Sequence, residues 1–323
     1  MELTIGKIRR LQQCASAGGR FVILAIDHRG NLQRALRPDD PDQATYEEMV
    51  AFKREVSAAL SPVSTAILLD PVYGAAQSVA AGAVAGRSGL VVAVEETGYT
   101  GEPTARESKI LPGWGVEQIA RMGGTAVKLL VYYHPEAPNA AAQEQLVREV
   151  AEACTRHDIP FFLEPLSFSL EGPREKLSQT ERRAVVVETA HRLTPLGVDV
   201  LKAEFPVDSN EVPDEGVWAD ACRELSDAST APWVLLSAGV SFAVYERQTL
   251  VACQAGASGV MAGRAVWNEA ATLSGAARTA FLLQVATARL ERLATLCAAH
   301  GRPWTDFYPE LARPFGEGWY ASY

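Results

Sequence analysis

Two lysines lie inside apolar runs of the chain, where a charged side chain is unusual. Lys202 lies in the run 198–207 and Lys128 in the run 126–133. Lysine is rarely buried without a partner, and removing its ammonium group from water lowers its pKa. A lysine that is partly neutral at pH 7 is a nucleophile toward carbonyl carbon. We therefore predict Schiff-base chemistry, with each lysine lowering the pKa of the other where the two converge.

Carboxylates occupy comparable positions in other apolar runs. Glu164 lies late in the run 159–166, and Asp27 directly follows the run 21–26. An aspartate, two lysines and a glutamate from four separate strands would perturb one another's pKa values, which is typical of functional sites. The alternative is that each lysine extends to solvent from an edge strand or pairs with a carboxylate.

Further polar residues lie at the ends of other runs. Asp70 ends the second run, Glu95 and Glu96 end the third, and Glu204 shares one strand face with Lys202 through the period of two. An aspartate alone at a strand end often caps a helix, so Asp70 carries little weight as a site residue.

The last two loops combine small residues with an arginine, which is typical of an anion site. Ser237 ends the seventh run and Gly239 comes two residues later, while Gly263 ends the eighth run and Arg264 follows it. Small residues let backbone N–H groups approach a phosphate closely, and an arginine adds charge-assisted hydrogen bonds. The predicted substrate- and phosphate-binding set is Ser237, Gly239, Gly263, Arg264, Arg29 and His28, the last two following Asp27.

Composition limits the function classes. The 323 residues are 48% hydrophobic and 21% charged, as in a soluble globular protein with a sizeable core. The net charge of −9 and the absence of a basic block argue against nucleic acid as a partner. The five cysteines form no Cys-x-x-Cys pair and the five histidines show no metal-ligand spacing, so we expect no disulfide framework, metal or cofactor.

The amino-terminal segment also limits location. Residues 1–20 are charged and lack the apolar core of a signal peptide. No apolar run approaches the ~18 residues that a membrane-spanning helix requires. We therefore expect a protein of the reducing cytoplasm with no membrane partner.

Eight apolar runs of strand length recur along the chain. They cover residues 21–27, 65–70, 89–95, 126–133, 159–166, 198–207, 232–237 and 259–263. Their near-continuous apolar character indicates a sheet that is buried on both faces and hence parallel.

Helix signals occupy the segments between these runs. Thr45 with Glu48 matches a capping box, and Ser178 with Glu181 matches a second one that opens a helix to about residue 193. Ser241 is placed to cap a helix that ends at residue 255 before a glycine, and residues 275–300 form the longest helical pattern.

Eight strands alternating with helices predict an α/β fold, a single-domain parallel eight-stranded (β/α)8 TIM barrel over residues 1–301. The alternative is an open doubly wound sheet, but the Gly-x-Gly-x-x-Gly turn that would favour it is absent after the first run. Residues 302–323 form a tail rich in aromatic residues, prolines and glycines. We expect this tail to pack on the barrel or on a neighbouring subunit; the alternative is a lid that brings Tyr320 or Tyr323 to the site.

Eight stretches, in order along residues 20–268, give the chain a family resemblance. They are LAIDHRG (24–30), ILLDPVYG (67–74), ETGY (96–99), AVKLLVYY (126–133), IPFFLE (159–164), VLKAEFPV (200–207), LSAGV (236–240) and AGRA (262–265). With them the chain resembles the class I tagatose-1,6-bisphosphate aldolases, a branch of the Schiff-base barrel aldolases.

The resemblance implies a metal-independent aldolase that cleaves a phosphorylated ketohexose, such as tagatose 1,6-bisphosphate, to dihydroxyacetone phosphate and a three-carbon aldehyde. It implies that Lys202 forms the Schiff base, with Lys128, Glu164 and Asp27 in the catalytic set. The residues Ser237, Gly239, Gly263 and Arg264 would hold the ketone-side phosphate. A homo-oligomer, dimer or tetramer, is the expected assembly.

Departures from the family pattern leave the substrate open. His28 stands where glutamine is more usual, the loop 104–109 is a further candidate for binding the distal anion, and the tail 302–323 does not match the family. A related branch cleaves 6-deoxy-6-sulfofructose 1-phosphate to sulfolactaldehyde, and the segment 257–267 is similar to that branch as well. The residues also allow an aldolase for a deoxy-sugar phosphate or a related lactam or lactone pathway substrate, and a sugar-phosphate sensor without catalysis.

Overall fold

Eight parallel strands form a closed barrel in the computed structural model, which describes residues 3–172, 175–312 and 316–322. The strands are β1 Phe21–Ala25, β2 Ala66–Leu69, β3 Gly89–Ala93, β4 Ala126–Tyr132, β5 Phe161–Leu166, β6 Val200–Ala203, β7 Trp233–Leu236 and β8 Gly259–Ala262. Each strand pairs with the next, and β1 closes the barrel on β8 with Val22 opposite Val260. This is the predicted single-domain (β/α)8 barrel.

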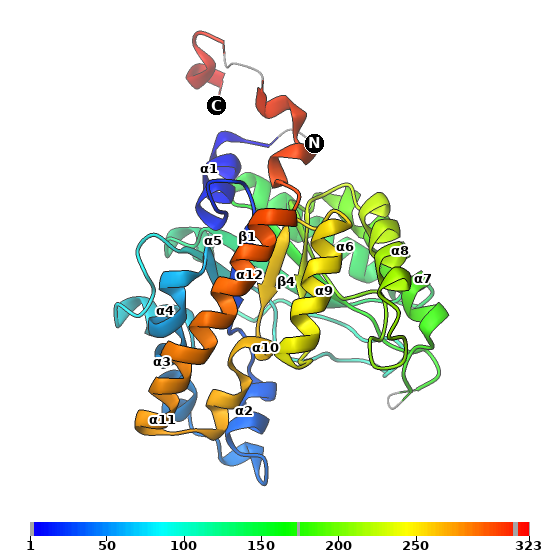
Figure 1. Ribbon diagram of the computed structural model, residues 1–323. Helices are drawn as coiled ribbons and strands as arrows, with labels where there is room; N and C mark the ends of the chain where they lie inside the picture. The colour runs from blue at the N-terminus through cyan, green and yellow to red at the C-terminus, as the bar shows by residue number, and fades with distance from the viewer. Residues whose placement is uncertain (1–2, 173–174, 313–315, 323) are drawn as a thin grey trace.

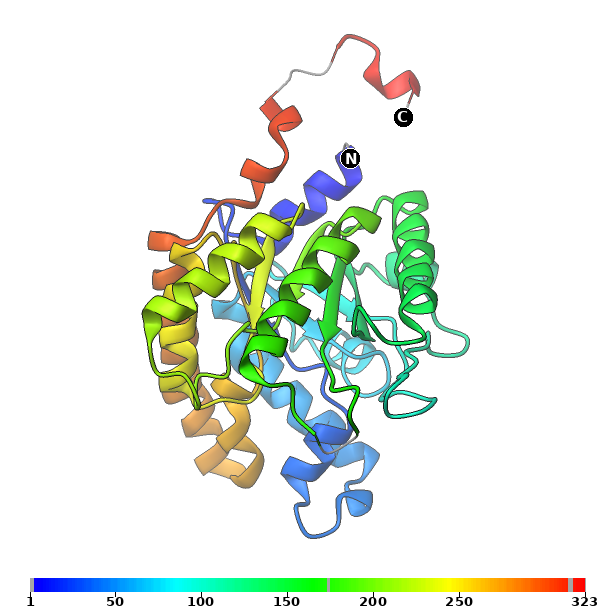
Figure 2. The ribbon, with the colours of Figure 1, turned by 90° about the vertical axis from the view of Figure 1, so that its right-hand side faces the viewer.

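Helices surround the barrel (Figures 1 and 2). They are α1 Ile5–Cys14, α2 Gly30–Leu36, α3 Tyr46–Leu60, α4 Ala75–Ala80, α5 Val116–Arg121, α6 Ala140–Arg156, α7 Gln179–Leu193, α8 Glu215–Ala228, α9 Phe242–Gln254, α10 Arg264–Trp267, α11 Gly275–Ala280 and α12 Thr287–His300. Both predicted capping boxes are present, at the starts of α3 and α7, and Ser241 caps α9. Gly256, just after α9, has φ +112°, a conformation that glycine adopts without strain.

Short helical turns lie between these elements and in the tail. The 3₁₀ turns are η1 Pro41–Gln43, η2 Ser61–Val63, η3 Thr194–Leu196, η4 Asn268–Thr272, η6 Trp304–Phe307, η7 Pro309–Ala312 and η8 Trp319–Ser322. The predicted helix over 275–300 contains a π-helical segment, η5 Phe281–Ala286, between α11 and α12. The Thr287 hydroxyl donates a 3.0 Å hydrogen bond to the Leu282 carbonyl, five residues back. Apolar periodicity over six residues does not distinguish this wider turn from an α-helical one.

The interior of the barrel is filled by side chains that alternate along each strand. Ile23, Val91, Phe162, Val200 and Met261 belong to one buried cluster inside it. Because side chains alternate with a period of two, the faces that carry Phe162 and Val200 carry Glu164 and Lys202 two residues further toward the carboxyl ends of the strands. The apolar layer therefore forms the floor beneath those polar side chains.

The amino-terminal end of the barrel is covered by α1 and by the start of the tail. Trp304 and Tyr308 are buried in the interior cluster with Leu11 and Cys14 of α1. The Tyr308 hydroxyl donates a 3.0 Å hydrogen bond to the Asp199 carbonyl. In Figure 1 the two chain ends lie at this end of the molecule, while α2, α10 and α11 lie at the other. None of the helices in the described ranges is long and apolar enough to span a membrane.

Candidate active site

A cavity of about 490 Å³ opens at the carboxyl ends of the strands. That volume is in the range of small-molecule sites, and this end of a barrel is where catalytic residues gather. Every predicted site residue except Gly239 lines it: Asp27, His28, Arg29, Lys128, Glu164, Lys202, Ser237, Gly263 and Arg264. Tyr320, which is 73% exposed, is not among the lining residues, and Tyr323 lies outside the described residues.

Lys128 of β4 and Lys202 of β6 point to one carboxylate oxygen of Glu164, which lies on the strand between them, β5. The Glu164 Oε2 atom lies 2.8 Å from the Lys202 Nζ atom and 2.9 Å from the Lys128 Nζ atom. Lys202 is 4% exposed and Lys128 is 1% exposed. Both lysines therefore meet the same buried anion, and neither extends to solvent.

Three carboxylates surround the Lys128 ammonium group. Its Nζ atom lies 2.9 Å from Asp27 Oδ2, 2.6 Å from Glu95 Oε1 and 2.9 Å from Glu164 Oε2. Burial alone would lower the pKa of Lys128, but these three negative charges hold it well above its ordinary value. The expectation that the pKa of Lys128 falls is therefore wrong: the sequence pattern revealed the apolar strand but not the number of carboxylates that converge on it.

The pKa values of Asp27 and Glu164 change in the opposite direction to that of Lys128. Burial would raise the pKa of Asp27, but the charges of Lys128 and Lys202 hold it well below its usual range. The pKa of Glu164 is likewise lowered, because the same two lysines outweigh burial. Both groups are therefore carboxylates at neutral pH, able to accept a proton.

Glu95 is a member of this cluster that the predicted site set omitted. It accepts a 2.6 Å hydrogen bond from Lys128 and a 3.1 Å bond from the Leu130 amide, and its carbonyl accepts a 2.9 Å bond from Arg29. The available signal was its place at the end of the third apolar run, which Asp27 shares at the end of the first. A strand-end position alone does not separate a site residue from a turn residue.

Asp70, which follows β2, has a structural role and is not a site residue. Its Oδ1 atom accepts hydrogen bonds from the Val72 and Tyr73 amides, which shapes the turn after β2. Its Oδ2 atom pairs with Lys53, and both side chains are fully buried. Lys53 also donates hydrogen bonds of 2.6 Å and 2.8 Å to the carbonyls of Ile26 and His28, on either side of Asp27. This pair therefore holds the loop after β1 in place and does not line the cavity.

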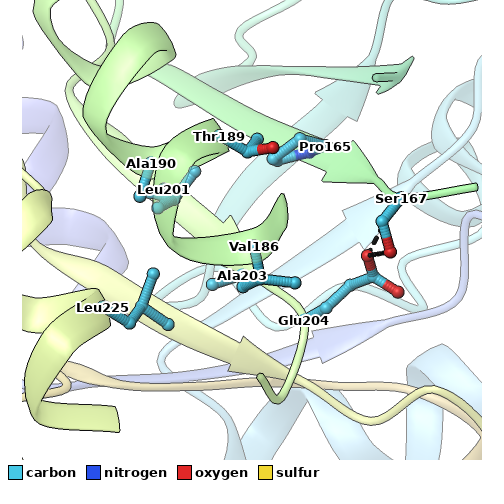
Figure 3. A pocket seen from close by; sticks show the side chains of 9 residues that line it. All are labelled: Pro165, Ser167, Val186, Thr189, Ala190, Leu201, Ala203, Glu204 and Leu225. Carbon is cyan, nitrogen blue, oxygen red and sulfur yellow. Dashed lines mark hydrogen bonds between the residues drawn. The ribbon is translucent and has the colours of Figure 1, made fainter. Parts of the chain in front are cut away.

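Glu204 lines the cavity, as its shared strand face with Lys202 predicted. Its Oε2 atom accepts hydrogen bonds of 2.7 Å from the Ser167 amide and 2.6 Å from the Ser167 hydroxyl. Figure 3 shows this contact beside a void of about 10 Å³ among apolar side chains such as Val186 and Leu225. The void is too small for a substrate. The Ser167–Glu204 contact joins the ends of β5 and β6 beside the 490 Å³ cavity.

His28, in the loop after β1, packs against residues that follow β8. Its ring meets the Trp267 ring edge-on at 5.3 Å, and a Cβ atom on Gly263 would lie 2.9 Å from its Cε1 atom. Burial lowers the pKa of His28 to about 3, although Asp27 acts in the opposite direction. The imidazole is therefore neutral at pH 7 and available as a hydrogen-bonding group rather than as a cation.

The loops after β7 and β8 bring the predicted anion-binding residues together. The Arg264 guanidinium lies against Gly239, where an added Cβ atom would come within 3.0 Å of its Cζ atom. Ala238 and Gly239 have φ values of +46° and +78°, and their amides find no protein acceptor in the described part of the chain. The buried Arg264 Nε atom also has no hydrogen-bond partner among those residues. Unpaired donors that converge in this way are suited to an oxyanion.

The Gly263 amide is already engaged, since it donates a 3.2 Å hydrogen bond to the Ser237 hydroxyl. This contact fixes the loop after β8 against the loop after β7. Within the described residues, no group of three or more His, Cys, Asp or Glu side chains is arranged to hold a metal ion.

Comparison with known proteins shows the family of this chain. A model of the DeoC/LacD family aldolases matches residues 21–269, which include all eight strands and the cavity. The chain belongs to the DeoC/LacD aldolase family. This aldolase is therefore an enzyme of the carbon–carbon lyase class.

Relatives and solved structures share most of this aldolase's length. A tagatose 1,6-diphosphate aldolase 1 of Streptococcus pyogenes is 33% identical over 291 residues, covering 83% of this chain and 86% of that protein. A tagatose 1,6-diphosphate aldolase 2 of Streptococcus agalactiae is 30% identical with the same coverage. The crystal structure of an archaeal fructose 1,6-bisphosphate aldolase shares the fold, with a TM-score of 0.60 at 20% identity over 90% of this chain and 98% of that one.

Proposed function

We propose that this aldolase cleaves a phosphorylated ketohexose by a Schiff-base mechanism, releasing dihydroxyacetone phosphate and a three-carbon aldehyde. Tagatose 1,6-bisphosphate is the proposed substrate, in keeping with the names of the streptococcal relatives. The observation that carries the proposal is the buried Lys202 amine, 2.8 Å from the ionised Glu164 at the floor of a substrate-sized cavity.

The reaction begins with proton transfer between these two groups. Glu164 takes a proton from Lys202, and the neutral amine attacks the C2 ketone carbon of the substrate. The attacking nitrogen then loses a second proton to the new alkoxide, which gives a carbinolamine. Glu164 returns its proton to the carbinolamine hydroxyl group, water leaves, and an iminium forms. The iminium accepts the electron pair that the next step releases, which a free ketone does less well.

Carbon–carbon cleavage follows removal of the proton from the C4 hydroxyl. Asp27 and Glu164, whose pKa values are both lowered, are the carboxylates that we propose for this step. The C3–C4 bond breaks, the aldehyde leaves, and the electron pair moves into an enamine on Lys202. Protonation at C3 and hydrolysis release dihydroxyacetone phosphate and restore the amine.

The other residues bind and orient. The protonated Lys128 neutralises Asp27, Glu95 and Glu164 and holds these carboxylates in place. Arg264 with the amides of Ala238 and Gly239 holds the ketone-side phosphate, and Ser237 braces that loop. His28 and Arg29 contribute hydrogen-bond donors from the first loop.

A coupled assay of dihydroxyacetone phosphate release from tagatose 1,6-bisphosphate tests the proposal. We expect turnover by the native protein, unchanged by EDTA, and none by Lys202→Met. Faster cleavage of 6-deoxy-6-sulfofructose 1-phosphate would transfer the assignment to the sulfosugar reaction. Binding of either sugar without cleavage would instead support a sensor. The homo-oligomer and the cytoplasmic location remain predictions.

A further inference from the structure

The long segment between β3 and α5, at the carboxyl end of the barrel, folds back on itself. Thr100 and Glu107 exchange backbone hydrogen bonds of 2.9 Å and 2.8 Å, and the Glu96 amide donates a 2.7 Å bond to the Lys109 carbonyl. The neighbouring loop anchors it, because the Asn139 side chain donates a 2.8 Å hydrogen bond to the carbonyl of Arg106. The backbone that carries Arg106 is therefore fixed.

Aromatic rings surround the Arg106 side chain. Its Cζ atom lies 4.8 Å from the centre of the Tyr99 ring, 5.7 Å from that of Tyr132 and 4.8 Å from that of Phe168. Stacking of this kind holds a guanidinium in place without neutralising its charge. The three rings come from three separate segments, so the orientation of Arg106 depends on the tertiary fold.

No carboxylate balances this charge in the described ranges, where no ion pair involves Arg106. Its Nε atom donates a 3.0 Å hydrogen bond to the Pro103 carbonyl, and its terminal nitrogens have no acceptor within those ranges. Other arginines near the site are engaged: Arg29 by the Glu95 carbonyl and Arg182 by Glu204. A fixed guanidinium with free donors is what a tetrahedral oxyanion requires.

Arg106 lines a second cavity, of about 340 Å³, that adjoins the first. Ala238 lines both cavities, and Tyr132 lines the first while its ring faces Arg106. The adjacent residues Leu166 and Ser167, at the end of β5, face the first and the second cavity respectively. A sugar whose first phosphate lies at Arg264 and whose ketone carbon lies at Lys202 would therefore extend toward a second cationic side chain, that of Arg106.

We propose that Arg106 binds the second acidic group of the substrate, the phosphate or sulfonate on the carbon farthest from the ketone-side phosphate. This inference rests on the proposed function and adds the residue that selects sugars with an anion at both ends. Arg264 holds one end, Lys202 reacts in the middle, and Arg106 holds the other end.

The test compares kcat/KM for tagatose 1,6-bisphosphate with kcat/KM for tagatose 1-phosphate. Arg106→Met keeps an apolar side chain among the rings but removes the guanidinium. We expect the ratio of the two values to fall about 10- to 150-fold, the effect of losing a charge-assisted bond. Lys109→Met is the matched control, since Lys109 lies on the same hairpin and its side chain is 53% exposed; there we expect the ratio to stay at the native value.

One outcome overturns the inference: a ratio in Arg106→Met that stays at the native value, whether both kcat/KM values are native or both fall by the same factor. Borohydride trapping of the native protein with dihydroxyacetone phosphate, which has no distal anion, separates the two proposals. A trapped adduct with an unchanged ratio removes the role of Arg106 and leaves the Schiff-base function standing. Absence of the adduct removes the proposed function itself. A sulfosugar substrate in the same comparison identifies whether the distal group is sulfonate or phosphate.

Discussion

The Glu164 Oε2 atom lies 2.8 Å from the Nζ atom of Lys202, deep in the carboxyl end of the barrel. The contact joins the proposed nucleophile to the carboxylate that we propose takes its proton. Because Glu164 is also 2.9 Å from the Lys128 ammonium, its carboxylate form is further stabilised.

Replacement of Glu164 by Gln tests the proton-transfer role. The amide keeps the shape of the side chain but cannot accept the proton of Lys202, so we expect the rate of Schiff-base formation to fall about 10²- to 10⁴-fold. Stopped-flow quenching with borohydride measures that rate directly. Adduct formation at the native rate in this variant would assign the proton transfer to another group.

Arg264→Ala tests the ketone-side phosphate site. Loss of a charge-assisted hydrogen bond of ~1.5–3 kcal/mol should appear mainly as a higher KM for phosphorylated substrate, with kcat less affected. Arg34→Ala is a suitable comparison, because Arg34 lines the same cavity but already donates a hydrogen bond to Asn31. Equal effects of the two variants on KM would place the phosphate elsewhere.

His28 predicts a pH dependence of stability. Its pKa of about 3 in the folded protein lies below the ordinary 6.5, so between these values the unfolded chain binds a proton that the folded chain excludes. Stability therefore rises with pH across this window and falls as the solution is acidified. Between pH 6.5 and pH 5, urea unfolding should show a loss of about 1.6 kcal/mol in total from this residue, because the unfolded histidine is only half protonated at pH 6.5. His28→Gln should lose correspondingly less, and an identical loss in both proteins would contradict the buried neutral imidazole.

The Lys53–Asp70 pair predicts a large stability effect away from the reacting atoms. Lys53→Met leaves a fully buried carboxylate without its partner, which costs about 3–5 kcal/mol of unfolding free energy. Urea denaturation measures the loss. The double variant Lys53→Met with Asp70→Asn should recover part of it, because the unpaired charge is gone. A cost below about 1 kcal/mol in the single variant would show that the pair contributes little.

The sequence predicted the barrel well for a physical reason. Strands buried on both faces must be apolar throughout, so their runs stand out, and the capping boxes of α3 and α7 mark helix starts by local chemistry. Lys202, Lys128 and Glu164 were conspicuous because charge inside such a run is rare.

Other features depend on contacts between distant segments, and the sequence pattern does not reveal them. Lys53 lies in an ordinary amphipathic helix, α3, and only the fold brings it against Asp70. The raised pKa of Lys128 arises because Asp27, Glu95 and Glu164 converge from three strands. The π-helical segment η5 differs from an α-helix in its turn width and not in its residue types.

The most direct test of the Schiff-base mechanism is intact-protein mass after borohydride treatment with dihydroxyacetone phosphate, followed by peptide mapping. We expect one reduced adduct, located on Lys202, and none in Lys202→Met. Lys128 should remain unmodified, since its ammonium is held protonated by three carboxylates. An adduct on Lys128, or no adduct in a protein that binds dihydroxyacetone phosphate, would contradict the assignment of Lys202 as the nucleophile.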